Sequence, residues 1–554
     1  MTATSATAAP DWDRAPLDLP HRTRIEIFIV VLLGILLAAL DQTIVGTALP
    51  VIVTDLKGND VYTWAFTAYL LTATVSGPIY GKLSDLFGRR IVFMTGVGIF
   101  LIGSALCATS GDMGQFIAYR GLQGLGAGAL FPVSLAIIAD IFAPSERGKY
   151  QGFFGAVFGL SSLIGPAIGG ILTDTVGWHW IFLVNLPLGL IVLFVIWRTL
   201  PTRIETGVKR TVDYLGAGAL VAALVPILIG LTNKQFGEWT DPEVGGLIAV
   251  GLGLAAVFVW LESRADEPIL PLGLFRIRAF TASVFAMFFA TMGFFAAIVF
   301  MPRWYQVVQG SSATEAGYQI LPLLGGLIVS AILSGQIVAR TGRYKELIFA
   351  SLLVMALGLF LLTNLRTESN PQLVWLWMGL TGLGIGPAFA VFTLAVQNNV
   401  PVQELGAATS GLTLFQQVGG TVGLAITGTI FGTKLLEEMG PQIVAAGVPP
   451  EVAQGFASGG SAALNNLAGV GDLDEKILAA LPPDQAAQLQ PFIAGIVDGI
   501  HQAFSIATAT TFVLGIGAAL AAAALVFFGL PGGRMGESAA APEANGAPAA
   551  EAEA

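Results

Sequence analysis

The chain has 554 residues, of which 55 % are hydrophobic and only 11 % are charged, and its mean hydropathy is +0.76. A soluble protein of this length would carry about 25 % charged residues, so the polar surface is too small to cover a water-exposed protein and the solvent must be lipid. The single cysteine, Cys107, excludes a disulfide framework and a thiolate metal site.

The net charge is −10, but the distribution of the 26 lysines and arginines is more informative than the sum. When they are assigned to alternate loops along the chain, most fall on one side of the membrane. Loops rich in Lys and Arg stay in the cytoplasm. This bias predicts that both termini are cytoplasmic.

Apolar runs long enough to cross a bilayer follow a predicted flexible cytoplasmic tail, residues 1–24, which lacks the features of a signal peptide. A membrane helix needs about 20 apolar residues. We count fourteen such runs, which predict an all-α integral membrane protein with 14 transmembrane helices: 27–50, 62–80, 91–109, 115–140, 150–173, 180–200, 214–231, 245–261, 279–301, 316–338, 347–363, 373–398, 406–432 and 502–530.

The chain also repeats itself weakly. The pattern Gly81-x6-Gly88-Arg89 recurs as Gly335-x6-Gly342-Arg343, and the glycine-rich stretch 121–128 recurs at 379–386. Chance similarity among glycine-rich helices is the alternative, but the matches occur in chain order at nearly constant spacing. They predict two six-helix halves, 25–200 and 279–530, with two helices inserted in 201–278.

The sequence predicts two segments without a membrane helix in the second half, an outer loop and a tail. The predicted outer loop 433–501 is long and acidic, and its Ala- and Gln-rich part predicts short helices over the outer mouth. Its stretch Asp472-Leu473-Asp474-Glu475 lacks the Gly and the later Glu of an EF-hand, so a solvated acidic loop is favoured over a calcium site. Residues 531–554 are low in complexity and predict a disordered cytoplasmic tail.

Asp41 is the only carboxylate deep within an apolar run, and Arg120 is the only deep basic residue. At about 1.5 Å per residue, both lie roughly 11–13 Å beneath the outer face, so they can meet. An intramembrane acid is a functional candidate by default, and an acid poised between desolvation and an arginine can bind and release a proton. The alternative is a purely structural ion pair. We favour proton coupling by Asp41 and Arg120.

A charged, glycine-bounded turn, Gly81 to Arg90, separates the second and third runs. We expect Asp85 to favour a neighbouring helix N-terminus, and Arg89 and Arg90 to pair across the inner face between the halves. In the fifth run, closely spaced glycines allow a partner helix to approach, and a proline bends the helix. The predicted gating residues are Gly81, Asp85, Gly88, Arg89, Arg90, Gly165, Pro166 and Gly169.

A broad, apolar site with few polar groups suits poorly defined substrates. The ninth run is rich in phenylalanine, and those rings could equally face lipid. The candidate substrate-binding residues are Gln42, Gln123, Phe289, Gln416 and Gln417.

Several segments resemble motifs of one transporter branch. Residues 81–90 resemble the loop between helices 2 and 3 of the major facilitator superfamily. Residues 40–50 (LDQTIVGTALP), 120–124 (RGLQG), 159–170 and 178–187 (WHWIFLVNLP) are similar to motifs of its fourteen-helix drug:proton antiporters, the QacA/EmrB type. Gly46 and His179 stand where that branch usually has Asn and Arg.

This resemblance implies a major facilitator fold and proton-coupled export of amphipathic compounds from a bacterial cytoplasmic membrane, by a protein that functions as a monomer without a cofactor. Export of a lipid or glycolipid to the outer leaflet is the close alternative. No nucleophile–base or metal constellation is evident, so the chain is not expected to be an enzyme. The glycine-rich stretch 121–128 follows no strand, so it predicts no nucleotide site, and no nucleic-acid partner is expected.

Overall fold

A computed structural model describes residues 17–56, 64–202, 213–234, 237–453, 474, 477 and 489–532, and these residues form helices and no strands. The first group of helices, here called the N-terminal half, consists of α1 (His21–Asp55), α2 (Trp64–Phe87), α3 (Arg89–Cys107), α4 (Met113–Ile141), α5 (Pro144–Thr175), α6 (Trp180–Leu183) and α7 (Asn185–Thr199).

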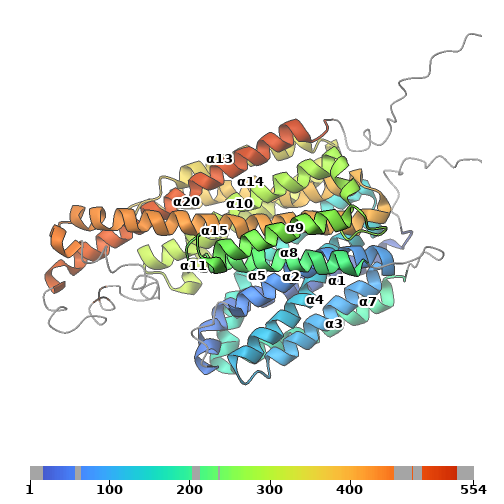
Figure 1. The fold of residues 1–554 in the computed structure, drawn as a ribbon, viewed down its shortest axis with the longest axis horizontal. Helices are drawn as coiled ribbons and strands as arrows, with labels where there is room; N and C mark the ends of the chain where they lie inside the picture. The colour runs from blue at the N-terminus through green and yellow to red at the C-terminus, as the bar shows by residue number, and fades with distance from the viewer. Residues whose placement is uncertain are drawn as a thin grey trace, which may run out of the picture.

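Two further helices follow, α8 (Tyr214–Asn233) and α9 (Leu247–Glu262), with the short turns η2 (Pro242–Gly246) and η3 (Leu272–Arg276) beside α9. The C-terminal half consists of α10 (Arg278–Val308), α11 (Ala313–Gln319), α12 (Leu321–Thr341), α13 (Lys345–Leu362), α14 (Pro371–Asn399), η4 (Val402–Glu404), α15 (Leu405–Ala445), η5 (Gln490–Phe492) and α20 (Ile493–Gly529). Figure 1 shows these helices running roughly along one direction.

Among the described residues, twelve helical segments are long and apolar enough to cross a membrane. The other two predicted runs, 62–80 and 150–173, correspond to the long helices α2 and α5. The threonine, tyrosine and small residues of α2, with Lys82 and Asp85 near its end, lower its mean hydropathy, whereas several side chains of α5 lie outside the described residues. The structure therefore gives an all-helical membrane protein, and the count of fourteen spans stays a prediction.

The internal repeat has a structural counterpart. Helices α4 and α14 match in length and are displaced by the same number of residues at both ends, 113 to 371 and 141 to 399. The second glycine of the repeated turn has a positive φ in both copies, 90° at Gly88 and 69° at Gly342. A side chain disfavours that backbone conformation, so glycine is required at the same turn in each half.

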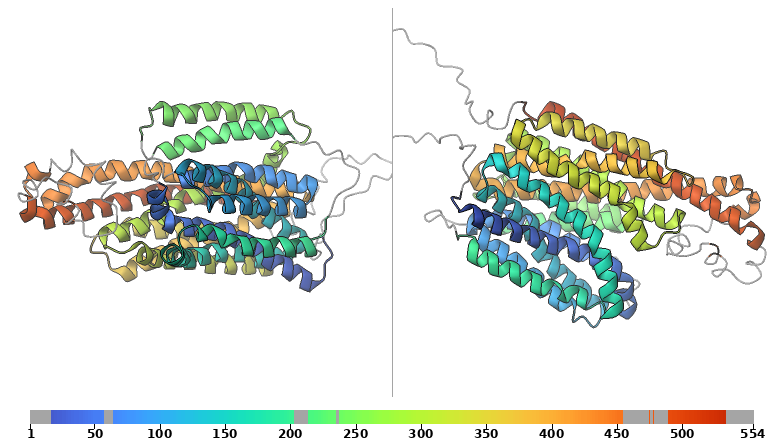
Figure 2. Two further views of the ribbon diagram at one scale, coloured as in Figure 1. Left: turned by 90° about the horizontal axis from the view of Figure 1, so that it is seen from below. Right: turned by 180° about the vertical axis from the view of Figure 1, so that it is seen from behind.

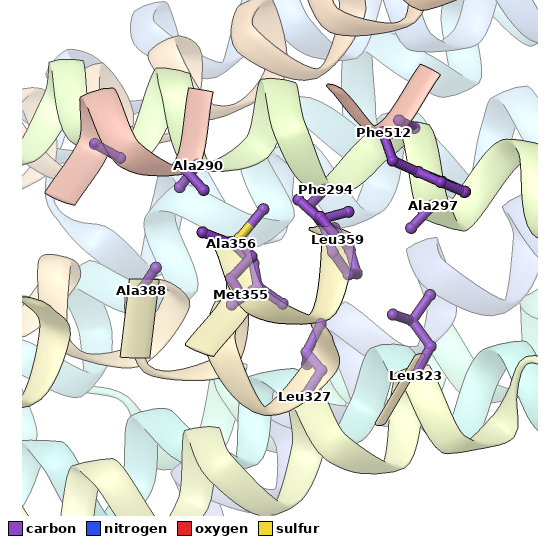
Figure 3. Close-up of a cluster of buried hydrophobic side chains, with 14 of the residues drawn as sticks. Ala290, Phe294, Ala297, Leu323, Leu327, Met355, Ala356, Leu359, Ala388 and Phe512 are labelled. Atoms are coloured by element: carbon purple, nitrogen blue, oxygen red, sulfur yellow. The ribbon is translucent and has the colours of Figure 1, made fainter. Parts of the chain in front are cut away.

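Each half has its own apolar core. One cluster joins α10, α12, α13, α14 and α20, and part of it is drawn in Figure 3. Two other clusters fill the N-terminal half. Helices of the two halves also contact one another, chiefly α5 with α12 and α2 with α15.

Helices α8 and α9 pack mainly against each other and stand outside the two halves (Figure 2, left). Helix α8 contacts α2 and α15, which belong to different halves. This placement suits two helices inserted between the halves, although the predicted limits 25–200, 201–278 and 279–530 stay predictions.

The predicted outer loop 433–501 is wrong at both of its ends. Helix α15 continues to Ala445 and α20 begins at Ile493, and the two helices run side by side past the rest of the molecule (Figures 1 and 2). Charged residues lower the hydropathy here, but Leu435, Met439 and Ile443 form one apolar stripe that packs in the same core as Ile496. Lys434 bonds Glu438 one turn later at 2.9 Å, which further favours the helix.

Other boundaries also differ from the prediction. Helix α1 begins at His21, within the predicted tail 1–24, and continues through Pro50 to Asp55. Helix α2 continues to Phe87, so only Gly88 of the predicted turn 81–90 is non-helical. Residues 1–16, most of 454–488, including all of the possible calcium stretch except Asp474, and the tail 533–554 lie outside the described residues.

Candidate ion-coupling site

Asp41 is buried in the middle of α1, and its carboxylate is surrounded by three side-chain donors from two other helices, α4 and α7. Arg120 of α4 donates from Nη1 to Asp41 Oδ2 at 2.5 Å. Neither side chain of the pair is exposed. The predicted meeting of Asp41 and Arg120 is therefore confirmed as a contact.

The second carboxylate oxygen, Asp41 Oδ1, accepts from two amides. Gln123 Nε2 donates at 2.8 Å and Asn185 Nδ2 at 3.2 Å. Asn185 also donates to Ser104 Oγ at 3.0 Å, and Ser104 donates to the Phe182 carbonyl at 2.9 Å. The polar groups thus form a connected cluster, which is how a buried charge is compensated.

Arg120 is fixed from several directions. Its Nη1 also donates to Gln123 Oε1 at 2.6 Å, and its Nε donates to the Ala65 carbonyl at 3.3 Å. Its guanidinium carbon lies 4.3 Å from the centre of the Tyr69 ring, where a cation–π attraction stabilises the charge. Its Nη2 is buried without a hydrogen-bond partner, so the cluster leaves one donor unused.

Glycines set the spacing of the helices around this cluster. A Cβ at Gly124 would overlap the Tyr69 carbonyl of α2, and a Cβ at Gly103 would lie 2.6 Å from the Gln123 backbone of α4. Because neither position carries a side chain, α2, α3 and α4 approach closely enough for Tyr69 and Gln123 to reach the ion pair.

Gly165 and Gly169 play the same part between α5 and α1. A Cβ at Gly165 would overlap Thr43, and one at Gly169 would lie 3.0 Å from the Ile44 carbonyl. Pro166 lies within α5, but its side chain is outside the described residues. The close approach is observed, and the gating role of these three residues stays a prediction.

The two halves are joined at the end of the bundle where α2 meets α3 and where α15 begins, here called the inner end. Asp85 accepts from the Gly406 and Ala407 amides of α15, both at 2.9 Å. The expectation that Asp85 favours a neighbouring helix N-terminus is therefore confirmed. A Cβ at Gly81 would lie 2.6 Å from the Gly406 carbonyl, so Gly81 allows α2 to contact α15.

The prediction that Arg89 and Arg90 pair across the halves is wrong. Arg89 forms ion pairs with Asp85 and with Asp140, the latter at 3.1 Å, and Arg90 bonds Thr202 at 3.1 Å. All these partners belong to the N-terminal half or to the residues just after α7. Arg89 is drawn to the Asp85 carboxylate one turn away, so it holds Asp85 in place and does not itself cross the interface.

A different cation, Arg147, does bond across the interface between the two halves. Arg147 of α5 donates from Nη1 to Asn398 Oδ1 of α14 at 3.2 Å. Gln397 of α14 donates to the Leu135 carbonyl of α4 at 3.1 Å. Sequence reasoning missed both contacts, although the sequence places several charged and polar residues at the inner ends of α4 and α5.

The candidate substrate residues do not lie together in one group. Gln123 uses both ends of its amide within the Asp41 cluster, so its described contacts are those of a positioning residue. Gln42 lies beside the Tyr69 hydroxyl. Gln417 Oε1 accepts from Thr74 of α2 at 2.5 Å across the two halves. Gln416 is half-buried, and its carbonyl accepts from Thr291.

Phe289 is half-buried, packs against the core of the C-terminal half and meets the Phe288 ring edge-to-face at 5.3 Å. Other phenylalanines of α10 differ in solvent exposure: Phe285 is 39 % exposed and Phe294 only 3 %. The phenylalanines of α10 therefore do not share one environment. Substrate binding by Gln42, Phe289, Gln416 and Gln417 stays a prediction.

Among the donors to Asp41, Asn185 is the one that sequence reasoning did not identify. It lies within the 178–187 motif, but nothing in that motif's spacing indicates that the side chain reaches α1. Among the described residues, no group of three or more His, Cys, Asp or Glu is placed to hold a metal ion. The charged chemistry of the site is therefore that of one acid, one guanidinium and their amide partners.

Comparison with known proteins agrees with this architecture. Residues 31–424 match the Major Facilitator Superfamily. The multidrug transporter protein MdtP of Bacillus subtilis (strain 168) is 40 % identical over 405 residues, which cover 73 % of this chain and 74 % of the relative. Multidrug resistance protein 3 of the same organism is 37 % identical over 401 residues, covering 72 % and 78 %.

Among solved structures, a double-tryptophan mutant of XylE has a TM-score of 0.58 at 16 % identity and covers 93 % of this chain and 97 % of that protein. At so low an identity the likeness concerns the fold alone.

Proposed function

The chain belongs to the major facilitator superfamily, and on that premise we propose that it exports amphipathic drugs or similar lipophilic compounds in exchange for protons. It is a membrane transporter and not an enzyme. The relatives that carry multidrug names support the substrate class. We further propose that it works as a monomer in a bacterial cytoplasmic membrane with both termini in the cytoplasm.

The observation that carries proton coupling is the buried carboxylate of Asp41 with its three side-chain donors, Arg120, Gln123 and Asn185. Three donors favour the charged acid, while burial favours the neutral acid. A small change in helix packing that lengthens the Arg120 contact would shift this balance toward proton uptake. Asp41 is thus the group whose proton occupancy can follow the conformation of the transporter.

The contacts at the inner end supply the second part of the cycle. Asp85, Arg147 and Gln397 all join the two halves there. We propose that these bonds form when the inner end is closed and break when it opens, so that the cargo site between the halves faces one side at a time.

Transport by purified protein in liposomes tests the proposal. A cationic dye should move uphill when a pH gradient is applied, and Asp41→Asn should abolish this uphill transport while passive exchange continues. Asp112→Asn is the matched control, because Asp112 is an exposed acid that caps α4, and it should transport normally. Undiminished gradient-driven transport by Asp41→Asn would refute the coupling role.

The paired extension of α15 and α20 favours the second candidate, export of a lipid or glycolipid. Helix α15 has 41 residues, which at 1.5 Å per residue is about twice the roughly 30 Å of the hydrocarbon layer. We propose that the excess lies beyond the outer leaflet, where it could receive a lipid. The same liposomes separate the candidates if the dye is compared with a fluorescent phospholipid.

A further inference from the structure

A second pair of acids lies at the inner end, outside the Asp41 cluster. Asp213 precedes α8, Glu262 ends α9, and the linker 263–277 leads from Glu262 to α10. Glu262 is only 3 % exposed. Neither acid has a part in the proposed coupling site.

Only one of the two carboxylate oxygens of Asp213 has a hydrogen-bond partner. Its Oδ1 accepts from the Gly216 amide at 2.7 Å and so caps α8. Its Oδ2 is buried and has no hydrogen-bond partner. A buried oxygen without a donor is costly, so this atom calls for an explanation.

Glu262 holds the linker. Its Oε1 accepts from the Ile269 amide at 3.3 Å and its Oε2 from the Leu270 amide at 3.2 Å. Ile269 and Leu270 are buried with Leu220 of α8 and Phe258 of α9. The carboxyl group of Glu262 therefore fixes the point at which the linker turns back onto α8 and α9.

The two acids face each other. Asp213 Oδ2 and Glu262 Oε1 both lie within 2.7 Å of the position that a Cβ on Gly216 would take. The distance between Asp213 Oδ2 and Glu262 Oε1 is therefore at most twice 2.7 Å.

The charged groups around the pair do not include a free cation among the described residues. Lys82 of α2 faces Glu262, but its Nζ is bonded to Glu267 of the linker at 2.7 Å. Glu404, which precedes α15, lies near Lys82 and adds further negative charge. Two carboxylates at short range in a water-poor site do not both ionise readily.

We propose that Asp213 and Glu262 hold one shared proton between Oδ2 and Oε1, which makes the pair a protonation site separate from Asp41. The proton gives the unpartnered Asp213 oxygen its hydrogen bond and removes the repulsion between the acids.

The location gives this site a consequence for the transporter. Glu267 of the linker is bonded to Lys82 of α2, Ile79 of α2 packs against the cluster that contains Ile269 and Leu270, and a Cβ on Gly411 of α15 would lie 3.0 Å from Leu270. The linker thus contacts both halves at the inner end. Loss of the shared proton at alkaline pH puts two negative charges side by side, and their repulsion pushes the Glu262 carboxylate, with the linker amides bonded to it, away from Asp213.

Thermal unfolding of the full-length protein in detergent, measured against pH, tests for the proton. Since the folded state keeps a proton that unfolded carboxylates have already lost, stability should fall as the pH rises through the titration of the pair. One such proton changes the ratio of folded to unfolded protein by about tenfold per pH unit. In Asp213→Asn, the amide oxygen still caps α8, and the amide N–H donates to Glu262, so no shared proton is needed. The fall in stability with rising pH should therefore disappear.

Asp112→Asn is the control for that substitution, because Asp112 caps α4 in the same way through the Gln115 amide at 2.8 Å. It should keep the wild-type pH dependence. An unchanged pH dependence in Asp213→Asn would overturn the proposal. So would a dependence on sodium at fixed pH that the substitution removes, because a bound cation would then replace the proton.

Thiol labelling tests the effect on the linker. In Leu270→Cys the new thiol is buried, and its labelling rate with a maleimide should rise more steeply with pH than that of the exposed thiol of Ser263→Cys, which corrects for the reactivity of the thiol itself. Adding Asp213→Asn should remove the excess. A ratio of the two labelling rates that does not change with pH would show that the linker does not respond to the pair.

Discussion

In the N-terminal half, Gly124 of α4 lies against the Tyr69 carbonyl of α2, and in the C-terminal half Gly382 of α14 lies against the Leu323 carbonyl of α12. The next contacts match as well: Gly103 meets the backbone of Gln123, and Gly358 meets that of Thr381. The two halves therefore use the same helix spacing at the same points of the repeat.

The side chains at the matched points differ. Where the N-terminal half has Tyr69, Arg120 and Gln123, the C-terminal half has Leu323, Met378 and Thr381. Figure 3 shows Leu323 and Leu327 within a hydrocarbon core beside Phe294 and Leu359. The shared glycines make a scaffold, and only one half uses it to hold an ion pair.

The inner end shows a second asymmetry. Asp85 of the N-terminal half accepts from the first amides of α15, whereas the corresponding position of the C-terminal repeat is Ala339. This contact at the inner end is therefore also specific to one half. These differences indicate that the N-terminal half carries the charged chemistry and the C-terminal half mainly supplies apolar packing.

The largest effect should come from replacing Arg120 of the N-terminal half by methionine, the residue at the matched position of the C-terminal half. Arg120→Met leaves Asp41 buried without its cation, which should lower the free energy of unfolding by about 3–5 kcal/mol. Thermal unfolding in detergent measures it. Adding Asp41→Asn should restore most of the stability but not gradient-driven transport, because a neutral pair has no uncompensated charge and no proton to exchange. Equal stability of the single and double variants would contradict this account.

The glycines should be equally sensitive in both halves. Gly124→Ala and Gly382→Ala each place a methyl group against a backbone carbonyl, and each should cost about 1–3 kcal/mol of unfolding free energy. Gly98→Ala and Gly325→Ala are the controls, because nothing lies within 4 Å of the added carbon, and they should be neutral or slightly stabilising. A loss confined to one half would break the comparison.

Asn185→Ala should have a smaller effect that is specific to the coupling site. It removes one donor from the Asp41 carboxylate and should cost about 1.5 kcal/mol. Because the donor favours the charged acid, its loss should move the pH profile of transport to higher pH. Thr381→Ala removes a buried hydroxyl from the matched region of the C-terminal half and should leave that profile in place. A shift in both variants would mean that the profile reports packing in general.

Asp85→Asn should give the smallest effect and act on conformation. An amide accepts from Gly406 or Ala407 but not from both, so the cap on α15 should weaken by about 1 kcal/mol, roughly a fivefold shift toward the inward-open state. The labelling rate of Leu135→Cys, a buried position near Gln397, measures that shift. Labelling that does not change with Asp85→Asn would count against a gating role.

The sequence by itself determined the features that depend on composition and on position along a helix. Apolar length predicted a helical membrane protein, the repeated glycines predicted matched halves, and the depths of Asp41 and Arg120 predicted their meeting. Depth follows directly from residue count in a helix. For this reason residue positions alone were enough to predict a contact between two helices of opposite direction.

Only the tertiary structure decided which side chains share a partner. The reach of Asn185 to Asp41, the use of both amide ends of Gln123 and the approach of Asp213 to Glu262 depend on the rotation and sliding of packed helices. The same holds for Arg89, which bonds within its own half, and for the extension of α15 and α20, whose apolar stripes are stable only against each other. Local periodicity says which face of a helix is apolar, but packing chooses the neighbour that this face meets.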